Sequence, residues 1–207
     1  MPVRYWLLIP EPFMSSQDLV IMFGPPAVGK MSVGAELSRL TSLPLFHNHL
    51  PIEMVIRVFP FGSEPYNRLV PQYRKLMFEE VAASELPGLI FTFVWDLNDP
   101  DDKAFIDGIT ATFSRARVCF VELCATLEER LSRNATPQRL SEKPSKRDVA
   151  FSQERLLAAE GEYRMNSAGD FFYPNCHFKI DNTHLPADEA ARQVIKHFGL
   201  RRSTDAG

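Results

Sequence analysis

One nine-residue segment, GPPAVGKMS at positions 24–32, constrains the fold of this chain more than any other. It follows the apolar run DLVIMF (18–23) and precedes a stretch in which Val33, Leu37 and Leu40 recur at helical spacing. The segment therefore predicts a buried strand, a glycine-rich loop and a helix, in that order. Small residues in such a loop let backbone N–H groups turn inward, where they and the helix N-terminus can bind a phosphate group.

Lys30 follows the second glycine of the pattern Gly-x-x-x-x-Gly-Lys and would place a positive charge on the outer phosphates of a nucleotide. A turn that only leads into a helix would need neither this glycine spacing nor the lysine. The next position, where Ser or Thr commonly binds magnesium, is Met31, and a thioether is a poor ligand for Mg²⁺. The nearest hydroxyl belongs to Ser32. The predicted nucleotide-binding residues of the loop are Gly24, Pro25, Pro26, Ala27, Val28, Gly29, Lys30, Met31 and Ser32.

The rest of the chain alternates strand and helix patterns. Further strands are expected at LPLF (43–46), GLIFTFVWD (88–96), RVCFVELCA (117–125) and HFKID (177–181). Helical patterns lie between them, and Thr126 with Glu129 forms a capping box at the start of one. Five strands joined by helices predict an α/β fold of three layers, with a parallel sheet covered on both faces. We expect a single domain at 18–207, preceded by an N-terminal extension at 1–17.

Composition limits the partners and the compartment. The formal net charge of −3 argues against a nucleic acid held by bulk charge. No apolar run approaches the roughly 20 residues of a membrane helix, and the N-terminal apolar run is too short for a signal peptide. The cysteines, Cys119, Cys124 and Cys176, form no Cys-x-x-Cys pair, which favours a reducing compartment. These features predict a cytoplasmic protein without a membrane or nucleic-acid partner.

The loop resembles that of nucleoside monophosphate kinases, in which a small residue and then Thr follow the lysine. Under this resemblance Met31 is a spacer and Ser32 takes the position of the family hydroxyl. The segment ERLSRN (129–134) resembles the helix that enters the lid of adenylate kinases. Arg130 then matches the arginine that stacks on adenine, and Arg133, one residue short in spacing, matches a second arginine that reaches the phosphates.

The resemblance extends to the lid and to the adenine-binding segment. The stretch at about 133–150 is basic, and the arginines of such a lid neutralise charge during phosphoryl transfer and help to exclude water. Arg139 and Arg147 are the catalytic candidates within it, and Asn182 matches the segment whose backbone borders the adenine. From Leu19 to about residue 200 the chain resembles the group of shikimate kinases and nucleoside monophosphate kinases, which implies the strand order 2-3-1-4-5.

Asp96 is predicted to end the most apolar strand, which is the layout of a Walker B carboxylate. A carboxylate at that place can hold magnesium opposite the loop hydroxyl, so Ser32 and Asp96 are the predicted Mg²⁺ ligands. The alternative is that Asp96 only caps the helix that follows.

His47 and His49 stand at the end of the second predicted strand, where small-molecule kinases of this group often present Asp. On an extended segment both would point the same way, and either could hydrogen-bond the acceptor and act as a general base. A zinc site would need three or four ligands, and purely structural histidines are the other alternative. The acceptor-binding segment is expected at about 47–86. Its charged candidates are Glu53, Arg57, Arg68, Arg74 and Lys75.

These features predict an ATP-dependent phosphotransferase that uses Mg²⁺ and moves the γ-phosphoryl group of ATP to a small-molecule acceptor, through a hydroxyl group. The alternative is a regulatory protein that binds and slowly hydrolyses a nucleotide without any acceptor. The base-reading motif N/T-K-x-D of GTPases is absent, and the basic lid favours a kinase. A polynucleotide 5′-kinase would need a basic acceptor channel, whereas the charge of residues 50–86 is mixed.

Overall fold

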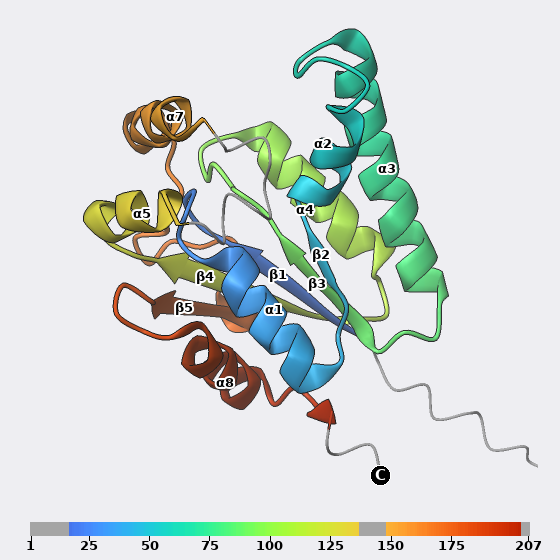
Figure 1. Cartoon of the computed structure of the whole chain (residues 1–207). Helices are drawn as coiled ribbons and strands as arrows, with labels where there is room; N and C mark the ends of the chain where they lie inside the picture. Colours follow the sequence, from blue (N-terminus) through green and yellow to red (C-terminus); the bar gives the residue numbers. More distant parts are fainter. Residues whose placement is uncertain (1–16, 137–147, 204–207) are drawn as a thin grey trace, which may run out of the picture.

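A parallel sheet forms the centre of the molecule, whose computed structural model describes residues 17–136 and 148–203 (Figure 1). In these ranges the sheet has five strands in the order β2-β3-β1-β4-β5, and every neighbouring pair is parallel. The strands are β1 (Asp18–Phe23), β2 (Leu45–His47), β3 (Gly88–Thr92), β4 (Arg117–Cys124) and β5 (His177–Asp181). The predicted fold class and strand order are confirmed.

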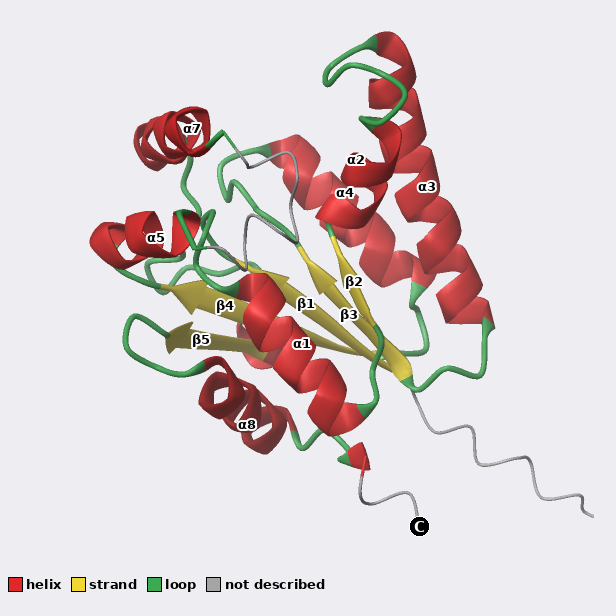
Figure 2. Ribbon diagram, viewed as in Figure 1, coloured by secondary structure: helices red, strands yellow, loops and turns green. Residues whose placement is uncertain are grey.

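Helices cover both faces of the sheet (Figure 2). The helices α1 (Lys30–Thr41) and α8 (Ala187–Phe198) pack on one face, and α3 (Glu64–Ala83) and α4 (Pro100–Thr112) pack on the other. Two short helices, α2 (His49–Val55) and α5 (Leu127–Asn134), and the longer α7 (Val149–Glu162) lie toward the carboxyl ends of the strands. A 3-10 turn, η2 (Pro174–Cys176), precedes β5. Within the described ranges, none of these helices is long and apolar enough to cross a membrane.

Strand β1 is buried on both faces, which explains why its sequence is continuously apolar rather than alternating. Its residues from Leu19 to Phe23 are fully buried. Leu19, Ile21 and Phe23 face the helices α3 and α4, whereas Val20 and Met22 face α1 and α8. The loop that follows β1 therefore leaves the middle of the sheet at its carboxyl end, where ligands of open α/β sheets bind.

Phenylalanine fills the layer between the sheet and the helices α3 and α4. The ring of Phe91 lies 5.0 Å from that of Phe78 and 6.2 Å from that of Phe105, both edge-on. Trp95, on the loop after β3, is fully buried against Phe23 at 5.3 Å. This rigid aromatic layer supports the strand ends that carry the candidate site.

The helical pattern expected between the second and third strands is confirmed as two helices, α2 and α3, which are joined by residues 56–63. Ser63 caps α3 by accepting a hydrogen bond from the Tyr66 N–H at 3.4 Å. The third strand is shorter than predicted, because β3 ends at Thr92 and not at Asp96. Its neighbour β2 ends at the same level, where His47 pairs with Thr92, so the chain beyond has no ladder partner on that side.

Candidate nucleotide and acceptor site

The loop between β1 and α1 has the backbone conformation that its glycines allow. Gly24 and Gly29 have φ angles of 133° and 107°, and Ala27 is left-handed with φ 62°. A side chain at Gly24 would place its Cβ 2.2 Å from the carbonyl oxygen of Leu123. Glycine is therefore required at this position, because the loop lies directly against the backbone of β4.

Lys30 is the first residue of α1, and its side chain folds back over the loop. The Lys30 Nζ donates hydrogen bonds to the carbonyl oxygens of Gly24 at 2.6 Å and Pro25 at 2.8 Å. These contacts hold a positive charge at the mouth of the loop, next to the N-terminus of the helix. Both features favour an anion.

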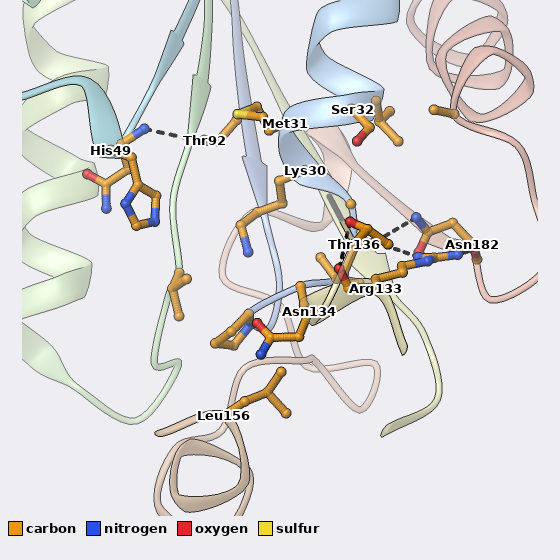
Figure 3. Close-up of a pocket in the computed structure, with 18 of the residues that line it drawn as sticks. Lys30, Met31, Ser32, His49, Thr92, Arg133, Asn134, Thr136, Leu156 and Asn182 are labelled. Carbon is orange, nitrogen blue, oxygen red and sulfur yellow. Dashed lines mark hydrogen bonds between the residues drawn. The ribbon is translucent and has the colours of Figure 1, made fainter. Parts of the chain in front are cut away.

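A cavity of about 610 Å³ opens around this loop (Figure 3). One end lies between the loop, α5 and the segment that joins β5 to α8. The other end reaches the start of α2 and the chain after β3. Besides the loop, its lining includes Asn48, His49, Thr92, Phe93, Val94, Arg133, Asn134, Ser152, Arg155, Leu156, Tyr163, Asn182, Leu185 and Pro186.

Arg133 is held in place along the whole edge of its guanidinium group. Its Nη1 donates to Val28 O at 3.0 Å, and its Nη2 donates to Asn182 O at 2.7 Å and Thr183 O at 2.9 Å. Its Nε donates to the Glu129 carboxylate at 2.8 Å. Because these bonds use the edge of a planar group, the faces stay available for stacking on an aromatic ring such as adenine.

Asn182 also ties the loop to the far side of the cavity. It is 2% exposed, and its Nδ2 donates to the same Val28 carbonyl at 2.7 Å. A Cβ on Gly29 would lie 3.0 Å from this nitrogen, so the close packing again depends on glycine. Arg133 and Asn182, predicted separately, therefore meet at one carbonyl of the loop.

Arg130 does not lie where the resemblance placed it, which corrects the expectation that it stacks on adenine. It is 2% exposed and does not line the cavity. Its guanidinium group donates to Glu160 of α7 at 2.5 Å and to Ala125 O at 3.3 Å. A buried guanidinium group needs a charged partner, and Glu160 supplies one. Arg130 thus joins α5 to α7, and Arg133 is the arginine of this helix that faces the cavity.

Asp96 also lies elsewhere than expected, which corrects its assignment as a metal ligand. Because β3 ends at Thr92, Asp96 belongs to the following loop and does not line the cavity. Its Oδ1 accepts hydrogen bonds from the N–H groups of Asn98 at 3.0 Å and Arg164 at 3.1 Å. In the described ranges, no three His, Cys, Asp or Glu side chains are grouped so that they could hold a metal.

Met31 and Ser32 both line the cavity, but they project to different sides of α1 (Figure 3). Met31 lies on the side of Thr92, and Ser32 points away from it. Consecutive residues of a helix are about 100° apart, so one turn of α1 cannot aim both at the same point. Thr92, the last residue of β3, also lines the cavity, and its hydroxyl group was not identified from the sequence.

The expectation that His47 and His49 point the same way on an extended segment is wrong. His47 is the last residue of β2, and His49 is the first residue of α2. Between them Asn48 has helical angles, φ −55° and ψ −22°, so the chain turns there. Only His49 of the two lines the cavity, and its Nδ1 lies 3.7 Å from Glu53 Oε1.

The other charged candidates of the acceptor segment do not line the main cavity. Arg68 pairs with Glu64 of its own helix, and Lys75 pairs with Glu79. Arg74 is half-buried over the ring of Phe105, and burial lowers its pKa. Arg57 and Glu53 lie along a separate small groove between α2 and α3.

The cavity is also lined by two residues that the sequence did not identify. Val94 follows β3, and Tyr163 follows α7, with exposed fractions of 36% and 41%. No sequence signal identified Val94, because the apolar run 88–96 predicted it to lie within a buried strand. Arg139 and Arg147 lie outside the described residues, as does most of the expected lid.

A buried carboxylate lies near the loop on β4. Glu122 is fully buried and accepts hydrogen bonds from the N–H and the hydroxyl of Ser167 at 2.8 and 2.6 Å. His177 and Lys179 of β5 approach it at 2.9 Å each. Burial alone would raise the pKa of Glu122, but the hydrogen bonds from His177, Ser167 and Lys179 outweigh it and lower the pKa to about 2. A charged residue within the apolar run RVCFVELC was the sequence signal for this network.

No family model matches the chain, and no curated protein matches it. Solved structures do. A protein of Chloroflexus aurantiacus described as a kinase is 15% identical, with a TM-score of 0.62, over 90% of this chain and 98% of that one. A gluconokinase of Sinorhizobium meliloti is 15% identical, with a TM-score of 0.54, over 90% and 93%. An APS kinase of Mycobacterium tuberculosis, solved with AMPPNP and APS, is 15% identical, with a TM-score of 0.52, over 89% and 98%. The chain thus has the fold of the small P-loop kinases.

Proposed function

We propose that this protein is an ATP-dependent phosphotransferase that moves the γ-phosphoryl group of ATP to a hydroxyl group of a small molecule. One observation carries the proposal: a single cavity has the loop with Arg133 and Asn182 at one end and His49 and Thr92 at the other, with Lys30 between them (Figure 3). A protein that only binds a nucleotide needs the first end alone. The structural neighbours named as kinases of small molecules support the same reading.

The donor half would bind ATP through the loop. Its N–H groups and Lys30 would hold the outer phosphates, where charge develops in the transition state. The guanidinium face of Arg133 would stack on the adenine, with Leu185 and Pro186 lining the same end of the cavity. Arg139 and Arg147, outside the described residues, are proposed to neutralise the transferring group, as the resemblance implies.

Magnesium fits the residues that are present. Mg²⁺ in nucleotide sites commonly takes one or two protein oxygens and otherwise phosphate and water oxygens. Ser32 provides a hydroxyl oxygen in the cavity next to Lys30, and we propose it as the candidate protein ligand. When bound, the ion would neutralise charge on the phosphates. Removing this hydroxyl, by Ser32→Ala, should raise the Mg²⁺ concentration needed for half-maximal turnover.

His49 is the proposed acceptor contact. It lies at the N-terminus of α2, beside Thr92, whose hydroxyl accepts the backbone N–H of Asn48 at 3.3 Å. The neighbours' names include gluconokinase and APS kinase, whose acceptors differ in chemistry, so they do not indicate one acceptor. Phosphoryl transfer with a loose transition state needs little base catalysis, so the main task of His49 would be to position the hydroxyl.

The test is an acceptor screen by ADP release. Sugars, gluconate, shikimate, aminoglycoside-like alcohols, nucleosides and nucleotides would each be added to the protein with Mg-ATP, with Lys30→Ala as the inactive control. The proposal expects at least one class to raise turnover well above hydrolysis in water. If none does while the protein still hydrolyses ATP, the regulatory alternative without an acceptor replaces it.

A further inference from the structure

Asn134, the last residue of α5, has a buried amide nitrogen that the fold itself does not use. The residue is 2% exposed and lines the cavity beside the loop. Its Nδ2 has no hydrogen-bond partner among the described residues. Figure 3 places Asn134 between Lys30 at the start of α1 and Leu156 of α7.

The other end of the same amide is fixed. The Ser152 hydroxyl of α7 donates to Asn134 Oδ1 at 3.1 Å, and Ser152 is itself 5% exposed. Arg130 and Glu160 join the same two helices, one turn away on α5 and about two turns away on α7. With the oxygen occupied by Ser152, the nitrogen is the group left to bind something else.

A buried N–H group without a partner is costly, by about 1–3 kcal/mol, and native proteins contain few of them. A purely structural link between α5 and α7 would be complete with the Ser152 hydrogen bond. The unused donor lies in a cavity whose loop and lysine already favour anions, so the acceptor it lacks is an oxygen of the ligand. Phosphate oxygens are strong acceptors, and a hydrogen bond to a charged oxygen is worth more than one between neutral groups.

We propose that Asn134 Nδ2 donates a hydrogen bond to an outer phosphate of bound ATP, and that Ser152 is the positioning residue that orients the amide. The inference rests on the proposed function and adds a binding residue to it. The nucleotide then contacts α5 twice, through the Arg133 face at the base and through Asn134 at the phosphates. Because Ser152 of α7 holds Asn134, a bound outer phosphate would be linked through Asn134 to α7.

The test compares ligands with and without outer phosphates. Affinities for a β,γ-imido ATP analogue and for AMP would be measured on wild type, Asn134→Leu and Ser152→Ala, each checked by thermal melting. Asn134→Leu should bind the analogue about tenfold more weakly and AMP within twofold of wild type. Ser152→Ala should show a smaller loss, about threefold, in the same direction. Asn98→Leu, at an exposed loop position outside the cavity, is the matched control and should change neither affinity.

A second variant keeps the test decisive if Asn134→Leu does not fold. Asn134→Asp keeps an oxygen for Ser152 but puts a carboxylate where the donor was, so it should weaken binding of the analogue more than Leu does. Added salt should reduce that loss. Unchanged affinity for the analogue in the folded variants, or equal losses for the analogue and AMP, would overturn the inference.

The two proposals fail in different ways. If wild type does not bind the analogue, the proposed function fails. If wild type binds it and Lys30→Ala greatly weakens binding, while Asn134→Leu and Asn134→Asp do not, only the role of Asn134 is wrong.

Discussion

The two ends of the cavity are built differently. At the donor end, Arg133 and Asn182 come from distant parts of the chain and both donate to the carbonyl of Val28 in the loop. At the proposed acceptor end, His49 stands on the seven-residue helix α2. Val94 and Tyr163, which line the same cavity, are 36% and 41% exposed. The first end is built on the backbone of the loop and on side chains bonded to it, whereas exposed side chains form the second.

Under the proposed function, this difference assigns substrate specificity to the end of the cavity that carries His49. A donor end made from backbone groups, with its glycines in tight contact, tolerates little variation and suits one common ligand. An acceptor end made from side chains on a short helix and two loops can change its ligand without changing the fold. Substitutions at the two ends should therefore affect different kinetic quantities.

The largest effect is expected for Lys30→Ala at the donor end. Removing the ammonium group takes away the only lysine charge on the cavity among the residues described as its lining. Turnover should fall by about a thousandfold, because stabilisation of the developing phosphate charge is lost. The measurement is ADP release with saturating acceptor. Lys75→Ala, an exposed lysine of α3, is the control and should retain wild-type turnover. A residual rate above a tenth of wild type would show that the loop does not act as proposed.

The pH dependence of stability should test the hydrogen-bond network of Glu122 on β4, the strand next to β1. The folded pKa of Glu122 is about 2, below its ordinary 4.5, so its stabilisation is complete above pH 4.5 and is lost as the pH falls toward 2. The difference corresponds to about 3 kcal/mol of unfolding free energy. Urea unfolding between pH 2.5 and 7 measures it.

Glu122→Gln is the matched variant for that experiment. It keeps the shape of the side chain but removes the charge that His177 and Lys179 approach at 2.9 Å. It should be less stable at neutral pH and should lose part of the pH dependence below 4.5. An unchanged slope of stability against pH would mean that other carboxylates govern the acid response.

Arg133 should matter for affinity more than for chemistry. Arg133→Ala removes the stacking face and frees Val28 O and Asn182 O, so the dissociation constant for ATP should rise about thirtyfold, or about 2 kcal/mol. Arg133→Lys keeps the charge but not the planar edge, and it should recover only a small part of the loss. Equilibrium binding of ATP measures both variants. Full recovery by lysine would indicate that charge alone matters and that adenine does not stack there.

The sequence predicted the donor end well because its motifs are local. Glycine spacing, Lys30 and the strand before them determine the loop within a short segment, and the loop leaves the carboxyl end of β1 in the middle of the sheet. The direction of a side chain could not be predicted from the local sequence, because it depends on tertiary contacts. Arg130 and Arg133 are both arginines of one short helix, and only the position of Glu160 on α7 decides which of them is buried. The prediction that Asp96 ends the strand and binds magnesium was wrong for a similar reason, because the end of β3 depends on where β2 stops pairing.

The acceptor end could not be derived from sequence beyond its general location. Asn48 is the N-cap of α2 and of a residue type favoured there, but the expectation of an extended segment overlooked it, and the turn at Asn48 separates the two histidine side chains. Val94 and Tyr163 come from segments about 70 residues apart, so their meeting at one cavity depends on the tertiary fold.

The smallest effect is expected at the acceptor end, for His49→Ala. It should lower kcat with the acceptor about tenfold and leave ATP binding unchanged, because positioning rather than base catalysis limits a loose phosphoryl transfer. His47→Ala is the matched comparison, since His47 stands two residues away but does not line the cavity, and it should change kcat less than twofold. Single-turnover rates with bound ATP separate this effect from nucleotide affinity. Equal losses in the two variants would indicate a structural role for both histidines, and a loss of ATP affinity in His49→Ala would mean that the two ends are not separate.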